Sequence, residues 1–183
     1  MGNETGHSNM NIVLIGYRGT GKTSVGMALA EKLGRDFYDA DDHIEKKAGT
    51  SISDMVHQEG WAFFRAKEKE AVRDLTALDG CVIAAGGGAV LDPENVEYMK
   101  KSGVVILLEA ATKTIFERMR EDIKTEQQRP SLTGKDPYEE IEEVLAFRRP
   151  LYKEAMDFSV DTTWKSIEEV LEEIVQRLQE HRE

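Results

Sequence analysis

One short glycine-rich stretch has the residues needed to bind a polyphosphate. Residues 16–23 read Gly-Tyr-Arg-Gly-Thr-Gly-Lys-Thr; they follow the apolar run 11–15 and precede a helical pattern over 24–33. This is the strand, loop and helix order of a phosphate-binding P-loop. Glycines let the backbone wrap closely, so that successive amides and the helix N-terminus face the phosphates. We expect Lys22 to reach the β- and γ-phosphates and the Thr23 hydroxyl to ligate Mg²⁺.

Two carboxylates follow the second apolar run. Because side chains alternate along an extended chain, Asp39 and Asp41 are expected on the same side of it. Ligands gather at the carboxyl ends of strands in open α/β sheets, so one carboxylate could hold the Mg²⁺ shell while the other orients an attacking hydroxyl. The alternative is that Asp41 or Asp42 only caps the next helix.

Further candidates are individually weaker. Arg65 and Glu68 are i, i+3 neighbours on an expected helix, where a surface ion pair is the simplest interpretation, although the preceding Phe63 and Phe64 suggest that Arg65 is packed in place. Residues 86–88 are three glycines at the end of an expected strand, which indicates either close ligand approach or a flexible turn. Arg-Pro at 129–130 and Arg-Arg-Pro-Leu-Tyr at 148–152 add cations.

An alternation of strands and helices must position these residues. Apolar runs at 11–15, 36–39, 82–85, 104–108 and 158–161 predict five strands, and the helical patterns between them predict a parallel α/β sheet. A long helical insertion is expected at about 42–78, with Ser51 as a helix cap within it. The last helix carries one apolar stripe from Ile167 to Leu178, with Ser166 or Thr163 as its cap.

The segment 122–138 resists assignment to a regular element. It contains two prolines, Gly134 and many polar residues, with little apolar periodicity. Long loops in compact domains are usually functional or disordered, so beside a P-loop we interpret this segment as a mobile lid, with an inert disordered loop as the alternative.

Composition narrows the class of protein. The 183 residues fit one domain at 10–183 after a disordered leader at 1–9, and no apolar run approaches the roughly 20 residues that span a bilayer. The net charge of −11 argues against general nucleic-acid binding and requires a local cluster of cations for any anionic substrate. The single cysteine, Cys81, fits a buried structural thiol in a reducing cytoplasm.

Taken together, the chain closely resembles the shikimate kinase family over about residues 11–162. The family pattern is an ordered set of motifs, which is far more specific than the P-loop alone. It comprises Gly-x-Gly-Lys-Thr at 19–23, Phe-x-Asp-x-Asp at 37–41, Phe-Arg-x-x-Glu at 64–68, Gly-Gly-Gly at 86–88, Arg-Pro at 129–130 and Arg-x-Pro-Leu-Tyr at 148–152.

This resemblance implies a three-layer P-loop kinase fold with a five-stranded parallel sheet in the order 2-3-1-4-5. It implies ATP-dependent phosphorylation of the 3-hydroxyl of shikimate by a monomer that uses Mg²⁺ and binds neither nucleic acid nor membrane.

The resemblance also implies roles for individual residues. Asp41 would orient the hydroxyl and act as base, Arg65 and Arg148 would clamp the shikimate carboxylate, and Gly87 would contact the substrate. Asp39 would hold Mg²⁺ through water and Arg129 would close over the phosphates. The expected ATP-binding residues are Gly16, Gly19, Thr20, Gly21, Lys22, Thr23, Ser24 and Arg129.

The chain departs from the family pattern in places. The arginine expected near adenine is either Arg118 or Arg120. Ser131 stands where the family often has Leu, and Trp61 stands where it commonly has Glu; neither is expected to touch a ligand. Two rival functions remain: a gluconate kinase, which shares the architecture, and a nucleotide-binding regulatory module without catalysis. The Phe-Arg-x-x-Glu and Arg-x-Pro-Leu-Tyr motifs favour shikimate over gluconate as the substrate. The retained Lys22, Asp41, Arg65 and Arg148 argue against a regulatory module.

Overall fold

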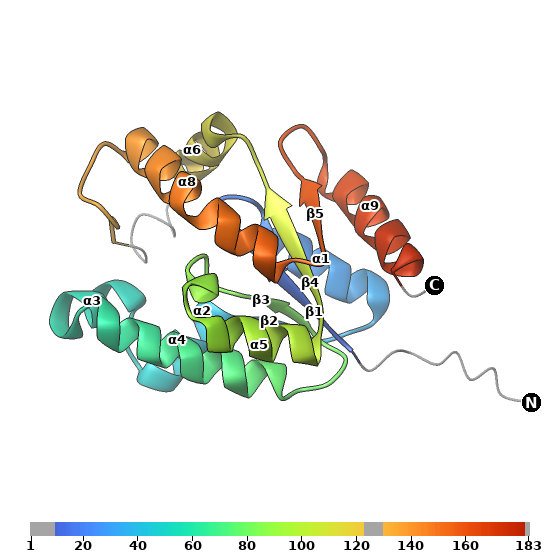
Figure 1. Cartoon of the computed structure of the whole chain (residues 1–183), viewed down its shortest axis with the longest axis horizontal. Coiled ribbons are helices and arrows are strands. Elements are labelled where there is room, and N and C mark those ends of the chain that lie inside the picture. Colours follow the sequence, from blue (N-terminus) through green and yellow to red (C-terminus); the bar gives the residue numbers. More distant parts are fainter. Residues whose placement is uncertain (1–9, 123–129, 182–183) are drawn as a thin grey trace, which may run out of the picture.

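The protein has a parallel α/β fold with the strand order β2-β3-β1-β4-β5 (Figure 1). The structure is a computed structural model and describes residues 10–122 and 130–181. The order confirms the topology implied by the family resemblance, and each expected strand is found with its ends correct to within one residue. The strands of the described chain are β1 (Asn11–Ile15), β2 (Phe37–Asp39), β3 (Val82–Ala84), β4 (Gly103–Glu109) and β5 (Phe158–Asp161).

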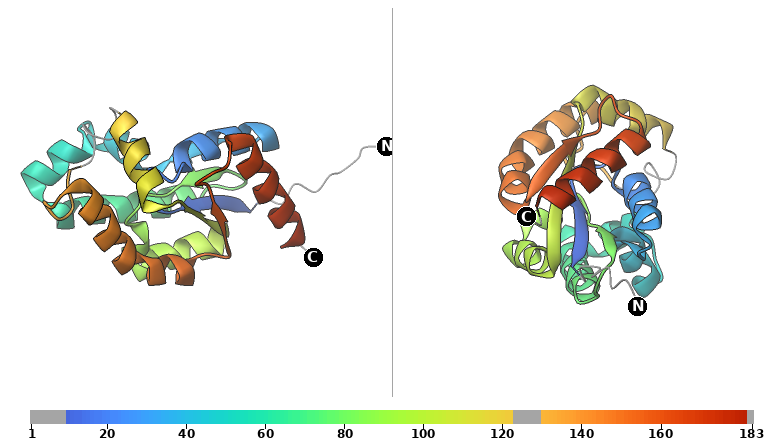
Figure 2. Two further views of the ribbon diagram at one scale, coloured as in Figure 1. Left: turned by 90° about the horizontal axis from the view of Figure 1, so that it is seen from above. Right: turned by 90° about the vertical axis from the view of Figure 1, so that its right-hand side faces the viewer.

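Helices cover both faces of the sheet and create the three expected layers (Figure 2). On one face, Ile12 and Leu14 of β1 pack with side chains of α1 (Lys22–Leu33) and α9 (Ile167–Glu180). On the other face, Val13 and Ile15 pack in a cluster that includes side chains of α4, α5 and α8. The bounds on this side are α4 (Trp61–Thr76), the 3₁₀ turn η1 (Ala89–Leu91), α5 (Pro93–Ser102), α6 (Thr112–Glu121) and α8 (Pro137–Ala155).

The register of the central strand brings the functional segments to one edge. Val13 of β1 pairs with Ile83 of β3 and with Val105 of β4, and β2 pairs with β3 in parallel. The carboxyl ends of these strands therefore meet, and the segments after β1, β2 and β3 are the P-loop, the aspartate pair and the glycine run. This is the edge at which open α/β sheets bind ligands.

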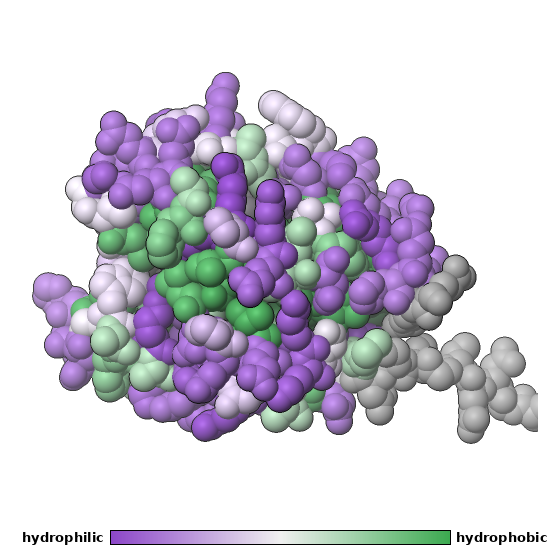
Figure 3. All heavy atoms as spheres, viewed as in Figure 1, coloured by the Kyte–Doolittle hydropathy of each residue, from purple (hydrophilic) through white to green (hydrophobic). Residues whose placement is uncertain are grey.

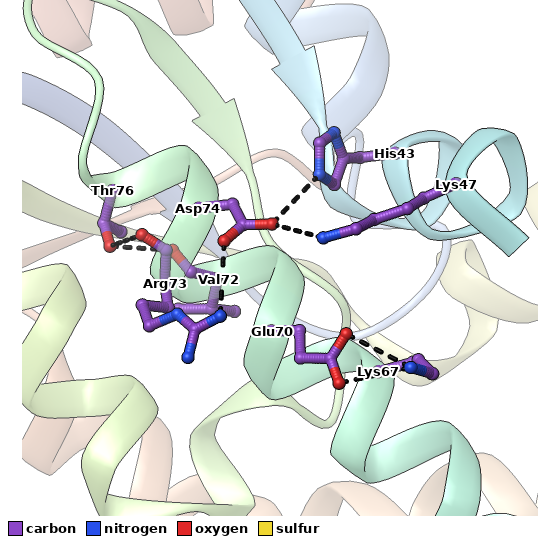
Figure 4. A network of polar contacts seen from close by, with 8 residues as sticks. All are labelled: His43, Lys47, Lys67, Glu70, Val72, Arg73, Asp74 and Thr76. Carbon is purple, nitrogen blue, oxygen red and sulfur yellow. Dashed lines mark hydrogen bonds and ion pairs between the residues drawn. The ribbon is translucent and has the colours of Figure 1, made fainter.

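The expected helical insertion consists of three helices: α2 (Ala40–Ala48), α3 (Ile52–Glu59) and α4. Gly49 and Gly60, both with positive φ, separate them, and Ser51 caps α3 by accepting a hydrogen bond from the Asp54 amide at 3.0 Å, as predicted. Charged side chains connect α2 to α4 (Figure 4). Lys47 Nζ lies 2.7 Å from Asp74 Oδ2, and that hydrogen bond is the main reason why the pKa of Asp74 is lowered.

The C-terminal part also follows the sequence pattern. Ser166 and Glu169 form a capping box at the start of α9, which settles the cap in favour of Ser166 over Thr163. The segment expected to be irregular ends where α8 begins at Pro137, and α6 extends to Glu121 before it. Residues 123–129, including Arg129, and the expected leader at 1–9 lie outside the described residues.

The surface is mainly hydrophilic on the face shown in Figure 3, with hydrophobic side chains gathered near the middle of that view. No helix in the described part of the chain is long and apolar enough to cross a membrane. Cys81 is buried, and its thiol donates to Asn11 Oδ1 at 3.2 Å, as befits the structural thiol expected from the sequence.

Candidate active site

The P-loop has the geometry that its glycines predict. Gly16, Gly19 and Gly21 have φ values of 142°, 73° and 100°, a region that favours glycine. A Cβ on Gly16 would also clash with the Leu108 carbonyl oxygen. Gly21 is the N-cap of α1, and as a glycine it supplies no side chain to cap the first amides of this helix. Such a helix N-terminus is a ready site for an anion.

Lys22 is folded back into the loop. Its side chain is buried, and Nζ donates to the carbonyl oxygens of Gly16 at 2.7 Å and Tyr17 at 2.9 Å. These contacts hold the ammonium group inside the curve of the loop, where a phosphate bound to the loop amides would lie close to it.

A cavity of about 340 Å³ opens over the P-loop. The expected residues Gly19, Thr20, Gly21, Lys22, Thr23 and Ser24 line it, together with Asp39, Asp41 and side chains of α6 and α9. Gly16 is not among the lining residues, so its part is to shape the loop.

The structure distinguishes the two arginines of α6. Arg118 lines this cavity, and its guanidinium donates to the Gly19 carbonyl at 3.0 Å and to the Thr162 carbonyl at 2.8 Å. Arg120 instead lies over the Phe116 ring at 5.7 Å and does not line the cavity. Of the two arginines, only Arg118 therefore lines the cavity over the P-loop.

Asp39 links the P-loop to the insertion. Thr23 Oγ1 donates to Asp39 Oδ2 at 2.8 Å, while Asp39 Oδ1 accepts from the Asp41 amide at 2.9 Å and caps α2. The sequence alternative named Asp41 or Asp42 as the cap; that assignment was wrong, because the cap is the last residue of β2. Burial, and then the charge of Asp41, raise the pKa of Asp39.

The pair Thr23 and Asp39 fits a magnesium ion. Mg²⁺ prefers hard oxygen ligands and usually takes few protein ligands beside water and phosphate. The described residues contain no group of three or more His, Cys, Asp or Glu side chains that could hold a metal alone. The Thr23 hydroxyl and the Asp39 carboxylate, beside a phosphate-binding loop, match the pattern of few protein ligands completed by water and phosphate.

Asp41 occupies the boundary between two cavities. It lines the nucleotide cavity and also a smaller one of about 40 Å³, and no other described residue lines both. Residues of the insertion and of the segment that leads into α8 line the smaller cavity. Its lining residues include Arg18, Arg65, Glu68, Gly87, Pro130, Leu132 and Arg148.

Arg65 and Glu68 do not form the surface ion pair that their spacing suggested. The Glu68 side chain is 2% exposed and the Arg65 side chain 28%, and Arg65 Nη1 lies 2.6 Å from Glu68 Oε1. Burial raises the pKa of Glu68, and the charge of Arg65 opposes that shift. The guanidinium also lies over the rings of Phe64 at 5.2 Å and Trp61 at 5.4 Å, so aromatic packing aims it, as expected.

The glycine run makes room for these side chains. A Cβ on Gly86 would lie 2.5 Å from Glu68 Oε2, and one on Gly88 would clash with the Arg65 guanidinium. Gly87 faces the cavity, and its carbonyl accepts a hydrogen bond from the Tyr152 hydroxyl at 2.6 Å. The run is thus a packed turn rather than a flexible one.

Two residues of this cavity were missed or misjudged from the sequence. Arg18 is buried, lines the cavity and donates from Nη2 to the Pro130 carbonyl at 3.3 Å. The sequence analysis missed Arg18 because it lies inside the P-loop, whose residues were interpreted only as phosphate ligands. The difference from the family pattern at Trp61 was expected to affect no proposed ligand-binding residue, yet its ring lies against the Arg65 guanidinium and lines the cavity.

Comparisons with known proteins show the family of this chain. The family model described as shikimate kinase matches residues 18–179. The shikimate kinase of Syntrophus aciditrophicus is 48% identical, covering 98% of this chain and 96% of the relative. The shikimate kinase of Symbiobacterium thermophilum is 43% identical, covering 95% and 99%.

Among solved structures, shikimate kinase from Acinetobacter baumannii in complex with shikimate matches with a TM-score of 0.89 at 32% identity, covering 96% of each chain. The shikimate kinase of Aquifex aeolicus matches with a TM-score of 0.77 at 32% identity, covering 94% of this chain and 98% of that one. By fold, motif order and sequence, the chain belongs to the shikimate kinase family.

Proposed function

We propose that this protein transfers the γ-phosphoryl group of ATP to the 3-hydroxyl of shikimate, giving shikimate 3-phosphate and ADP for aromatic amino-acid biosynthesis. The single observation that carries the proposal is Asp41, which borders both a P-loop cavity and a cavity lined by arginines. Phosphoryl transfer requires donor and acceptor to be held in line, with charge neutralised around the moving group.

ATP binds over the P-loop. The amides of Gly19, Thr20 and Gly21 face its phosphates. When ATP binds, the Lys22 ammonium donates to the β- and γ-phosphate oxygens in place of the Gly16 and Tyr17 carbonyl oxygens. Ser24 lies in the first turn of α1 and lines the same cavity. Arg118 packs against the adenine. Arg129, outside the described residues, remains a proposed clamp on the transferring phosphate.

Thr23 and Asp39 would hold Mg²⁺, the hydroxyl as a direct ligand and the carboxylate through water. When bound, Mg²⁺ neutralises charge on the phosphate oxygens. Burial and the neighbouring charge of Asp41 raise the pKa of Asp39, and a bound cation would oppose both effects.

Shikimate binds in the smaller cavity. A carboxylate is best held by the planar guanidinium of Arg, which can donate two parallel hydrogen bonds. Arg65 and Arg148 line the cavity and clamp this group, and Arg18 adds a third guanidinium. Gly87 lets the substrate approach the backbone closely. Because the chain carries a net charge of −11, this cationic cluster is what makes an anionic substrate acceptable.

Asp41 orients the acceptor hydroxyl toward the phosphates and accepts its proton. Its carboxylate lies at the junction of the two cavities, so it can reach a hydroxyl that points toward the γ-phosphate. The amide of Asp41 is fixed by Asp39, which sets the start of α2 and the direction of the side chain.

A coupled assay of ADP release with shikimate, gluconate or no acceptor tests the proposal. We expect rapid turnover with shikimate alone, and phosphorus NMR should show the phosphate ester. Faster turnover with gluconate would identify a sugar-acid kinase. Nucleotide binding without turnover on either acceptor would indicate a regulatory module.

A further inference from the structure

One carboxylate outside the site described above receives an unusual number of hydrogen bonds. Glu140 lies in the first turn of α8 and is 6% exposed. Its Oε2 accepts from Ser131 Oγ at 2.5 Å, from the Leu132 amide at 3.1 Å, and from Thr133 through both its amide at 2.9 Å and its hydroxyl at 3.0 Å. Hydrogen bonds to a charged acceptor are stronger than neutral ones.

These contacts shape a segment that has no regular structure of its own. Residues 130–136 contain neither helix nor strand, so no ladder or helical turn satisfies the amides of Leu132 and Thr133. The Glu140 carboxylate instead accepts the hydrogen bonds of these amides. The N-terminus of α8 favours a negative charge at this position, which helps to keep the carboxylate ionised.

The segment held in this way is one wall of the substrate cavity. Pro130 and Leu132 line that cavity opposite Ile52, Trp61 and Phe64 of the insertion. In Figure 1 the segment descends from the start of α8 toward the insertion. The Pro130 carbonyl also accepts from Arg18 Nη2 at 3.3 Å, so the position of the wall sets the position of a cavity guanidinium.

We propose that Glu140 is a positioning residue for acceptor binding: by holding residues 131–133, it fixes the Pro130–Leu132 wall and, through the Pro130 carbonyl, the guanidinium of Arg18. The inference rests on the proposed function of this cavity. Ser131 is part of the same hydrogen-bond network. Its hydroxyl makes the shortest of the hydrogen bonds to Glu140 and also accepts a hydrogen bond from the Gly134 amide at 2.8 Å. A leucine, which the family often has here, would lose both contacts.

The chain provides a matched control. Glu143 lies on the same helix, one turn after Glu140, and pairs with Lys135 at 2.6 Å. Both side chains of that pair are about half exposed, and surface pairs of this kind contribute about 0–1 kcal/mol. Glu143→Gln therefore makes the same chemical change on the same helix without removing a contact to residues 131–133.

The test is steady-state kinetics of Glu140→Gln beside Glu143→Gln and wild type, with hydrogen exchange at residues 131–134. Displacing binding groups by about an ångström can cost up to ~10²-fold. We expect the shikimate KM of Glu140→Gln to rise about 10- to 100-fold, while kcat at saturating shikimate and the ATP KM stay within about threefold. The amides of 131–134 should exchange faster in Glu140→Gln only.

Ser131 variants keep the inference testable if Glu140→Gln does not fold. Ser131→Ala should raise the shikimate KM severalfold, and Ser131→Thr, which retains the hydroxyl, should restore it. A wild-type shikimate KM in Glu140→Gln, or in Ser131→Ala where only that variant folds, overturns the inference. So does an equal rise in the ATP KM, which would indicate a general structural defect. If the wild-type protein does not phosphorylate shikimate, the proposed function fails instead, and the exchange data still report whether Glu140 holds the segment.

Discussion

Arg65 shows how a single cation is prepared to bind an anion. Its guanidinium is fixed by the buried Glu68 carboxylate and by two aromatic rings, so little side-chain entropy is left to lose when a substrate binds. Because Glu68 engages Nη1, the rest of the guanidinium can face the cavity that Arg65 lines.

Removing either clamp arginine should weaken acceptor binding. Arg65→Ala and Arg148→Ala should each raise the shikimate dissociation constant about 10- to 150-fold, since a hydrogen bond to a charged group contributes roughly 1.5–3 kcal/mol. ATP affinity without shikimate should stay near wild type. Isothermal titration calorimetry measures both, with Arg120→Ala as the control that leaves the cavity intact. Unchanged shikimate affinity in both variants would eliminate the carboxylate clamp.

The glycine run makes a second residue-scale prediction. In Gly88→Ala the new methyl group would collide with the Arg65 guanidinium and force it to move, so the shikimate KM should rise by about an order of magnitude or more. Gly80→Ala is the control: nothing lies within 4 Å of its Cβ position, but its φ of 69° makes alanine strained. It should lower stability without changing the shikimate KM. Equal KM values in the two variants would show that Gly88 does not position Arg65.

Residue types and spacing were enough to find most of these side chains, but not their burial. The i, i+3 spacing of Arg65 and Glu68 is the same for a surface pair and for a buried one. Glu68 lies against Gly86, a residue distant in sequence, so its burial depends on tertiary packing. Arg18 was missed for the same reason, since its cavity is completed by the segment before α8.

At the scale of elements, the junction between β2 and α2 has both a structural and a functional role. Asp39 ends the strand, caps the helix through the amides of Asp41 and Asp42, and faces Thr23 of the P-loop. The helix boundary and the expected metal ligand are therefore the same residue. The sequence predicted that β2 ends at Asp39, but not that the same residue caps α2, because extended and capping residues have similar backbone conformations.

Asp39→Asn separates the two roles. Asparagine caps helices as well as aspartate, so α2 should remain. Because burial raises the pKa of Asp39, its ionised form is disfavoured in the folded protein, and the free energy of unfolding at pH 7 without Mg²⁺ should be unchanged or higher. Loss of the carboxylate should instead raise the Mg²⁺ concentration needed for half-maximal turnover. Urea denaturation and a Mg²⁺ titration give the two quantities; a large loss of stability with an unchanged Mg²⁺ requirement would leave only the capping role.

Across the whole molecule, the acidic side chains differ in whether they are exposed or buried. Most acidic side chains are solvated, but Glu68 and Glu140 are buried, and their pKa values move in opposite directions. Burial raises both, yet hydrogen bonds from Ser131, Thr133 and Leu132 outweigh burial at Glu140 and lower its pKa. Stability in acid therefore depends on whether the hydrogen bonds to each buried carboxylate outweigh the effect of its burial.

The lowered pKa of Glu140 predicts a pH-dependent stability difference. A carboxylate whose pKa is lower in the folded protein stabilises it above the unfolded value of about 4.3, and this contribution disappears as the pH falls through the folded value. The difference in unfolding free energy between wild type and Glu140→Gln should therefore be constant from pH 7 to about 5.5 and shrink below that. Urea denaturation at several pH values measures it. A difference that is the same at pH 7 and pH 3.5 would contradict the assignment.

The sheet itself could be predicted well, because each strand is a short apolar run between helical patterns. The strand order could not, since those runs carry no information about which strands pair; it came from the family resemblance. The small cavity is likewise a property of the whole fold. It needs the P-loop, the insertion, the glycine run and the start of α8 together, so Glu140 and the wall it holds have no local sequence signal.

The central claim is that Asp41, at the junction of the two cavities, orients and deprotonates the acceptor hydroxyl. The direct measurement is the rate of phosphoryl transfer by Asp41→Asn with ATP, Mg²⁺ and shikimate all saturating, beside calorimetric affinities for both substrates. We predict a rate loss of about 10²–10⁴-fold, the usual range for a general base, with the ATP affinity near wild type. A wild-type rate would contradict the account and reduce Asp41 to a residue of the first turn of α2.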